Sequence, residues 1–326
     1  MLPENDFDYL FPERRTFYSY INFIKAASKW PRFCGEMNKS HPLIDTRDIS
    51  TAMDQACAAE LASLFAHFTQ EVGAHSGKME AWREGLYYVE EIGCENNACP
   101  QYNTPCNDGN WTQYAFPCTA NVTYHGRGAK QLSYNYNYGT FSRVMINDFS
   151  LLHHPDRITQ NGYLAFASAI YFFMTPRSPK PSIHQTITGL WQPTPNDVSA
   201  HRQLGFGVQT LIVNGRIECG TGELVPQAKN RSHYFIKFAT FLNVFDAVFK
   251  DTQLDCINSL PFTTTNGSKT FYKGFIAKKS QSTCDYVYWE ETGFSAFIPG
   301  DLGLCVQSLK ENSYPGFPST WINKKS

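Results

Sequence analysis

One glutamate in the first third of the chain has a spacing that suits acid–base chemistry. Glu71 ends a series that begins with Leu61, Leu64 and Phe68, and successive members of this series are three, four and three positions apart. A helix there would place the acid on an apolar stripe. Burial favours the neutral form of a carboxyl group and raises its pKa, as a general acid near neutral pH requires. Glu71 is therefore a candidate proton donor, the alternative being a helix end at which it turns to water.

A second acidic cluster lies shortly after Glu71, in the segment WREGLYYVEEIGC. Its carboxylates are Glu84, Glu90 and Glu91. Hydrolysis of a glycosidic bond commonly uses one protonated and one ionised carboxyl group on opposite sides of the scissile bond. The cluster could supply the partner of Glu71, or it could be a solvated surface.

The segment 124–139, YHGRGAKQLSYNYNYG, combines glycines, amides, a hydroxyl group and tyrosines without an apolar period. We interpret it as lining a site and not as core. Amide and hydroxyl side chains pair with sugar hydroxyls, and tyrosine rings offer flat apolar surface to a sugar ring. The alternative is a set of turns followed by a half-buried strand that exposes Tyr134, Tyr136 and Tyr138.

Composition and charge limit the classes of partner. The chain has 326 residues, 42% of them hydrophobic, and a formal net charge of −1. That length and composition can fill a sizeable core. The charge balance does not favour capture of nucleic acid or of an anionic membrane. Its longest apolar run is far shorter than the roughly 18 residues of a spanning helix. We expect a soluble monomer whose ligand is uncharged.

The cysteines predict a disulfide framework. Their number is ten, an even count that is unusual for a reduced cytosolic enzyme. The chain has no CxxC pair and no HExxH, so we expect no metal and no other cofactor. Five glycosylation sequons also indicate an oxidising, extracellular compartment: Asn38, Asn110, Asn121, Asn230 and Asn266. We expect a secreted protein whose signal peptide, absent from this chain, has been removed.

Apolar residues recur at helical spacing in four segments, so the fold is expected to be mainly α. These segments are 18–29, 51–71, 162–175 and 231–248. Long loops over 93–123 and 176–204 separate them, and four cysteines in the first suggest stapling. Composition changes after about residue 262, where TTTNGSKT is typical of a linker. The sequence predicts one domain over 1–262 and an extension of unknown role over 263–326.

Several segments, in order over residues 18–262, resemble the family 19 glycoside hydrolases, the plant-type chitinases. They include FYSYINFIKAASKWPRFCG, LFAHFTQEVGAHSG, GLYYVEEIG, HGRGAKQLSYNYNYG and GFGVQTLIVNGRIECG. The resemblance implies a lysozyme-like, α-rich, bilobal chitinase fold with long disulfide-stapled loops and a small C-terminal appendage. It also implies that the partner is chitin or chitooligosaccharides.

The resemblance also assigns roles to individual residues. Glu71 becomes the proton donor and Glu91 the base, because GLYYVEEIG aligns without a gap only on Glu91; Glu90 remains an alternative. Ser133 helps the base hold the attacking water. The implied sugar-binding residues are Gln131, Tyr136, Asn137, Asn214 and Lys180, and the implied ionic network behind the acid is Glu218 and Arg231.

Cysteine pairs follow partly from the same resemblance. Two pairs match family disulfides, Cys106 with Cys118 and Cys219 with Cys256. Three further pairs are suggested by proximity in the sequence alone: Cys34 with Cys57, Cys94 with Cys99, and Cys284 with Cys305.

Departures from the family pattern leave three functional hypotheses. Gln70 and Gly73 replace a histidine and a threonine beside the acid, and Lys130 stands where an isoleucine is common. The intact carboxylates favour an endo-acting, inverting chitinase, with the base and acid roles given above. The alternatives are a chitin-binding protein of the same fold that has lost catalysis, and a lysozyme-like hydrolase of bacterial peptidoglycan.

Overall fold

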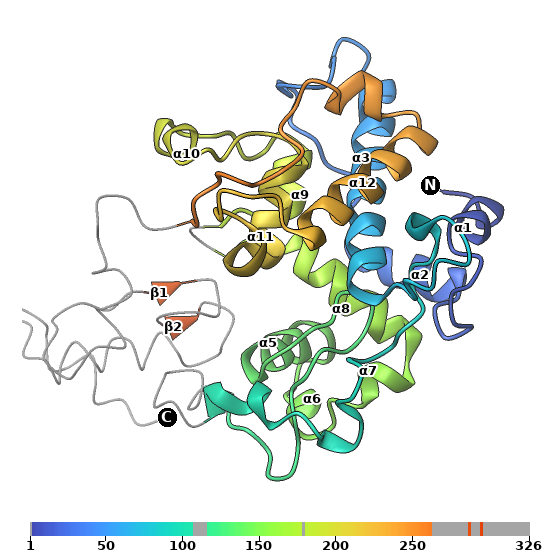
Figure 1. Ribbon diagram of the computed structural model, residues 1–326, viewed down its shortest axis with the longest axis vertical. Helices are drawn as coiled ribbons and strands as arrows, with labels where there is room; N and C mark the ends of the chain where they lie inside the picture. The colour runs from blue at the N-terminus through green and yellow to red at the C-terminus, as the bar shows by residue number, and fades with distance from the viewer. Residues whose placement is uncertain (1, 107–115, 178–179, 263–285, 288–293, 296–326) are drawn as a thin grey trace, which may run out of the picture.

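The computed structural model describes residues 2–106, 116–177, 180–262, 286–287 and 294–295, and these residues are largely helical (Figure 1). The longer helices are α1 (Glu4–Leu10), α2 (Tyr20–Ala27), α3 (Ile49–Val72), α5 (Asn135–Ile146), α8 (Gly162–Met174), α11 (Phe206–Glu218) and α12 (Pro226–Phe241). The shorter ones are α6 (Ser150–His153), α7 (Arg157–Gln160), α9 (Ile183–Ile187) and α10 (Pro195–Ser199). Single turns complete the helical part: η1 (Ala81–Arg83), η2 (Glu95–Asn97), η3 (Pro100–Cys106) and the π-helical η4 (Phe245–Phe249).

Helix α3 is the central element. It begins at Asp48, whose carboxylate accepts the backbone N–H of Ser50 at 3.1 Å, a typical N-cap. Apolar and small residues then cover nearly its whole circumference, as expected of a helix surrounded by protein. Helix α12 lies beside it in Figure 1, and the two helices contact each other extensively. The catalytic candidate Glu71 lies in the last turn of this helix.

Aromatic rings from four helices and one loop fill the core around Phe65 of α3. Its ring centroid lies 5.1 Å from Phe11, 5.7 Å from Phe23 and 5.7 Å from Phe238. Phe166 of α8 packs 5.5 Å from Phe23. Buried rings of this size remove much apolar surface from water, and their tilted and edge-on geometries add to that gain. The core thereby fixes the position of α3 from several sides.

The remaining helices form two groups in Figure 1. Helices α5, α6 and α7 lie beneath α8, whereas α9 and α11 lie beside α3 and α12. The mainly α, bilobal architecture implied by the sequence is confirmed. Beyond residue 262 the described residues form one parallel pair of strands, β1 (Tyr286–Val287) and β2 (Phe294–Ser295). In the described residues no helix has the length and apolar character needed to cross a membrane.

Three interpretations of the sequence need correction. The tyrosines after residue 133 do not lie on a strand, because α5 begins at Asn135. The segment 124–139 is also partly core: Tyr124 and Tyr138 are fully buried, and their hydroxyls donate to the backbone oxygens of Leu152 and His125. A tyrosine buried with a satisfied hydroxyl behaves as a core aromatic residue. The predicted helix over 231–248 begins earlier, at Pro226, and ends at Phe241.

Four disulfides connect the described residues, and they match four of the five pairs suggested above. They are Cys34–Cys57, Cys94–Cys99, Cys106–Cys118 and Cys219–Cys256. Two of them staple the long loop that follows Glu91. Cys284 and Cys305 lie outside the described residues, as do Asn110 and Asn266. Of the other sequons, Asn121 is exposed, whereas Asn38 donates its amide to the oxygen of Gly189 at 3.0 Å.

A buried acid–histidine pair joins α9 to α3. Glu60 is inaccessible to solvent and lies 2.5 Å from Nδ1 of His184, while its other oxygen accepts the N–H of Cys34. Nε2 of His184 lies 3.3 Å from Glu36. Burial lowers the pKa of His184, but the two carboxylates outweigh burial, and the pKa is raised. Burial also raises the pKa of Glu60, and the hydrogen bond and charge of His184 oppose that rise, so His184 is the partner that this buried acid requires.

We predict that His184→Ala destabilises the fold strongly. Removal of one partner of a buried pair leaves a carboxyl group without compensation, which typically costs about 3–5 kcal/mol in the free energy of unfolding. Denaturant unfolding followed by circular dichroism measures the effect near neutral pH. The control is Arg32→Ala, which removes an exposed partner of Glu36; equal effects of the two substitutions would contradict the prediction.

Candidate active site

Glu71 is held by an ion pair at the end of α3. One of its carboxylate oxygens lies 2.6 Å from Nη2 of Arg231 on α12, and both side chains are largely buried. The guanidinium of Arg231 also reaches His67, one helical turn before Glu71, with Nη1 3.3 Å from Nδ1. Burial lowers the pKa of His67 well below its usual range, and the nearby cations act in the same direction. His67 is therefore neutral and can accept from Arg231.

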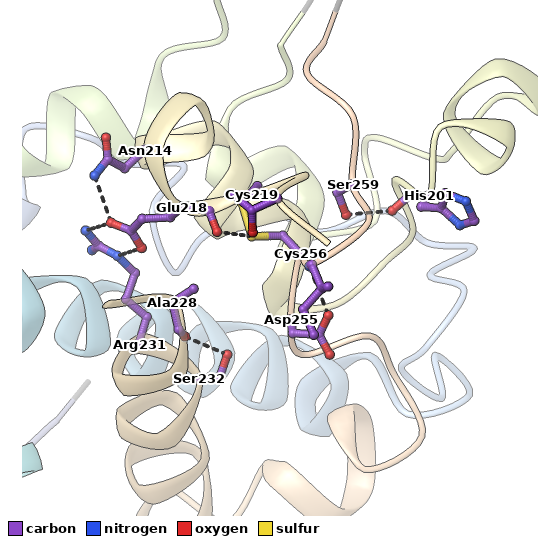
Figure 2. The surroundings of a disulfide bond; sticks show 12 residues. His201, Asn214, Glu218, Cys219, Ala228, Arg231, Ser232, Asp255, Cys256 and Ser259 are labelled. Atoms are coloured by element: carbon purple, nitrogen blue, oxygen red, sulfur yellow. Dashed lines mark hydrogen bonds and ion pairs between the residues drawn. A yellow bond between two sulfur atoms is a disulfide. The ribbon is translucent and has the colours of Figure 1, made fainter. Parts of the chain in front are cut away.

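Arg231 is in turn held by Glu218, at the end of α11. Nε and Nη2 of Arg231 each lie 2.9 Å from one oxygen of Glu218, a bidentate pair. Figure 2 shows this pair and the amide of Asn214, which donates to Glu218 at 2.8 Å. The disulfide Cys219–Cys256 lies directly beside Glu218 and fixes the end of α11. Three helices are thus joined through one arginine.

The pKa of Glu71 differs from the expectation of the sequence. Burial raises it, but the positive charges of Arg231 and Lys130 and the hydrogen bond from Arg231 outweigh burial, and the pKa lies below its ordinary value of 4.5. The prediction of a raised pKa from burial alone is therefore wrong. Two cations that lie far from Glu71 in the sequence reverse the direction of its pKa shift.

The segment that leaves α3 is tightly hydrogen-bonded. The N–H of Gly73 donates to the oxygen of Thr69 at 3.0 Å, and an added Cβ at Gly73 would collide with that oxygen. Glu84 accepts from the N–H and hydroxyl of Ser76, at 2.7 and 2.6 Å. The glycine thus fits a close approach of backbone, and Glu84 serves to hold the loop after Glu71.

The neighbouring glutamates Glu90 and Glu91 have different surroundings. Glu90 faces a buried pair of bases, 3.2 Å from Nε2 of His125 and 4.0 Å from Nε of Arg127. Glu91 accepts the hydroxyl of Tyr102 at 2.7 Å, and its backbone N–H donates to Gly126. Burial and the charge of Arg127 lower the pKa of His125, so Glu90 has a hydrogen-bond partner in His125 and a cation, Arg127, at the limit of ion-pair distance. Glu91 has only uncharged hydrogen-bond partners among the described residues.

A row of tyrosines lies next to Glu91. The ring of Tyr102 lies 5.5 Å from that of Tyr134, and Tyr134 stacks on Tyr136 at 5.7 Å with only 7° between the ring planes. Burial raises the pKa of Tyr102, and the hydrogen bond to Glu91 and the charges of Glu91 and Glu71 act in the same direction. Tyr102 therefore lies within the electrostatic reach of both carboxylates. Sequence reasoning missed it, because it lies in a stapled loop without any period.

The segment 125–139 brings its polar side chains to the same region. Gln131 packs against Gly126, beside the backbone that pairs with Glu91. Ser133 donates its hydroxyl to the oxygen of Gln131 at 2.9 Å, and no hydrogen bond from it to Glu91 is formed within the described part of the chain. Asn137 donates to the oxygen of Ser133, while its own buried Oδ1 has no partner among the described residues.

Two further candidates lie apart from this cluster or are otherwise engaged. The backbone of Lys180 pairs with that of Arg177, with N–O distances of 2.8 and 2.9 Å, and residues 178–179 between them are not described. Nothing in the described contacts joins the Lys180 ammonium to Glu71 or Glu91. The amide nitrogen of Asn214 is directed to Glu218, which leaves its oxygen for other contacts.

The comparison with known families gives the class of protein. The family model for class I chitinases of glycoside hydrolase family 19 matches residues 8–256, and the chain belongs to this family. The solved structure of chitinase C from Streptomyces griseus HUT6037 superposes with a TM-score of 0.55 at 24% identity, covering 78% of this chain and 96% of that one. This likeness supports the fold.

Plant relatives are more similar in sequence. A basic endochitinase of Vitis vinifera is 36% identical over 246 residues, which cover 76% of this chain and 68% of the relative. A protein of Hevea brasiliensis named inactive chitinase-like protein 1 is 35% identical over 251 residues, with the same two coverages. The family therefore includes both named endochitinases and a member named inactive, at nearly equal distance from this chain.

We predict that Arg231→Gln costs about 3–5 kcal/mol in the free energy of unfolding near neutral pH, because it leaves Glu71 and Glu218 ionised without their shared cation. In the wild type Arg231 keeps the pKa of Glu71 low, so this contribution to stability is present above the unfolded pKa and is lost as pH falls through the folded one. The difference between the two proteins should shrink in acid. Unfolding at several pH values tests this, with exposed Arg216→Gln as the control; a difference independent of pH would contradict it.

Proposed function

We propose that the protein is an endo-acting chitinase that hydrolyses β-1,4-linked N-acetylglucosamine polymers with inversion. Glu71 is the proton donor, and Glu91 is the base. One observation carries the proposal: Tyr102 hydrogen-bonds Glu91 and also lies within the field of Glu71, so that a single side chain relates the two carboxylates. Family membership supports the substrate class.

The mechanism needs two proton transfers in one displacement. Protonated Glu71 gives its proton to the glycosidic oxygen as the bond from that oxygen to the anomeric carbon breaks. A water on the opposite face of the sugar attacks the anomeric carbon and loses a proton to ionised Glu91. Both protons then exchange with solvent, which returns Glu71 to its acid form and Glu91 to its base form.

The residues around the carboxylates suit the other demands of the reaction. Tyr102 orients Glu91, and Arg231 fixes the direction of Glu71. We assign Ser133 to the attacking water, which requires its hydroxyl to leave the oxygen of Gln131. Asn137 is assigned to a sugar contact, which requires its buried Oδ1 to become accessible. Gln131, Tyr136, Asn214 and Lys180 are assigned to further sugar contacts.

A second function, chitin binding without cleavage, is favoured by one specific observation. The pKa of Glu71 is lowered by Arg231 and Lys130, so that little of the carboxyl is protonated near neutral pH. An acid that is rarely protonated is a poor donor. The relative from Hevea brasiliensis, about as similar to this chain as the endochitinase is, is named an inactive chitinase-like protein. The same residues would then hold chitin without breaking it.

Hydrolysis of chitohexaose by the wild type, Glu71→Gln and Glu91→Gln separates these functions. We expect both variants to lose activity by about 10²–10⁴-fold, the usual contribution of a general acid or base. Glu90→Gln is the matched control, since Glu90 pairs with His125 and should affect turnover far less. Binding of the hexamer, measured by calorimetry, should persist in all variants.

The outcomes distinguish the alternatives clearly. A wild type that binds chitohexaose but does not cleave it at any pH would establish the binding function. Loss in Glu90→Gln with full activity in Glu91→Gln would reverse the assignment of the base. Cleavage of bacterial walls without cleavage of chitin would reject the proposed substrate class.

The remaining assignments concern the whole chain. We propose that residues 1–262 form the catalytic domain and 263–326 an extension, and that the protein is a secreted monomer. The disulfides support an oxidising compartment. Among the described sequons, exposed Asn121 is the best placed for a glycan.

A further inference from the structure

Tyr134 has a backbone conformation that residues other than glycine rarely adopt. Its φ and ψ are 70° and 144°, in a region that glycine enters freely and that a residue with a Cβ enters only at a cost. Hydrogen bonds on both sides enforce it. The N–H of Tyr134 donates to the oxygen of Tyr124 at 2.7 Å, and its own oxygen accepts the N–H of Tyr138 at 3.2 Å as α5 begins. Tyr124 and Tyr138 are fully buried, so the core holds both anchors in place.

The ring of Tyr134 is what this costly conformation places. A glycine would take the same backbone conformation with less strain, but it would carry no ring. The ring contacts two other tyrosines, with its centroid 5.7 Å from that of Tyr136 and 5.5 Å from that of Tyr102. Both distances are typical of attractive aromatic pairs. Backbone strain of this kind occurs often at functional sites, where it sets the direction of a side chain.

Tyr102 connects this ring to Glu91. Its hydroxyl donates to Oε1 of Glu91 at 2.7 Å. The backbone beside it is anchored, because the amide of the next residue, Asn103, donates to the oxygen of Val122 at 2.6 Å. An anchored backbone still allows a half-buried ring several rotamers, so a neighbour must hold the ring in one of them. Tyr134 supplies that neighbour.

We propose that Tyr134 is a positioning residue for the candidate base: its ring packs against Tyr102 and keeps that hydroxyl on the carboxylate of Glu91. The role in turnover rests on the proposed function, whereas the arrangement of the two tyrosines at the carboxylate does not. Without the ring, the phenol of Tyr102 gains rotational freedom and spends less time on Glu91. The carboxylate then loses the donor that directs it, and a misdirected base takes the proton of the attacking water less efficiently.

Carbon-13 NMR of labelled tyrosine in the full-length protein tests the arrangement. The signal of the Tyr102 ring carbon that bears the hydroxyl, assigned through Tyr102→Phe, reports the hydrogen bond to Glu91. Tyr134→Gly removes the ring and suits the backbone, so it should move this signal. The movement should be smaller in a Glu91→Ala background, where only the direct effect of the ring on the signal remains. Tyr134→Phe should leave the signal in place, as should the control Tyr9→Ala, which removes a ring stacked on Phe241 at 5.3 Å.

A double-mutant cycle on turnover tests the route through Tyr102. Tyr134→Gly should lower kcat for chitohexaose by about tenfold, less than the loss of a general base itself, while KM changes far less. Tyr134→Phe should restore kcat. In a Tyr102→Phe background the glycine substitution should have almost no further effect. An unchanged kcat, additive losses in the double variant or a loss confined to KM would overturn the route.

The two tests separate the inference from the proposed function. Equal signal movements with and without the Glu91 carboxylate would overturn the inference, whatever the activity. A larger movement with the carboxylate, in a protein that never cleaves chitohexaose, would support the arrangement while rejecting the enzyme. Should Tyr134→Gly fail to fold, Tyr134→Leu removes the aromatic ring but keeps apolar bulk, and equal movements in that variant would likewise overturn the inference.

Discussion

The shared guanidinium of Arg231 is the interaction on which the rest of the site depends. It holds Glu71 and Glu218 in a buried setting where two carboxylates alone would repel each other. Because the three residues come from α3, α11 and α12, the ion network also fixes the relative positions of these helices. The amide of Asn214 supplies a further hydrogen bond to Glu218, and the adjacent disulfide fixes the end of α11 that carries it.

The proposed base is held in a different way from the proposed acid. Glu91 lies in a loop segment, and its carboxylate is oriented by a tyrosine hydroxyl instead of a cation. A neutral donor keeps the carboxylate in place without neutralising its charge, which suits a group that must accept a proton. The stapled loop after Glu91 carries Tyr102, so the disulfides there contribute to the position of Glu91. Glu71 thus obtains its geometry from helix packing, and Glu91 obtains its geometry from loop stapling.

The helical period predicted the main helices and the burial of Glu71 well, because apolar spacing directly reflects which side of a helix faces the core. It failed at α5, where asparagine and tyrosine hide the period, and at Tyr102, which lies in an irregular loop. The sign of the Glu71 pKa shift could not be predicted from local sequence, because Arg231 lies 160 residues away.

The central claim is that Glu71 and Glu91 act on opposite faces of one scissile bond, which requires inversion at the anomeric carbon. The most direct measurement is proton NMR of the first products formed from chitohexaose, recorded before the anomers equilibrate. Inversion requires that the new reducing ends appear first as the α-anomer. Initial appearance of the β-anomer would contradict the assignment of Glu91 as base, because a retained configuration requires a nucleophile in place of the attacking water.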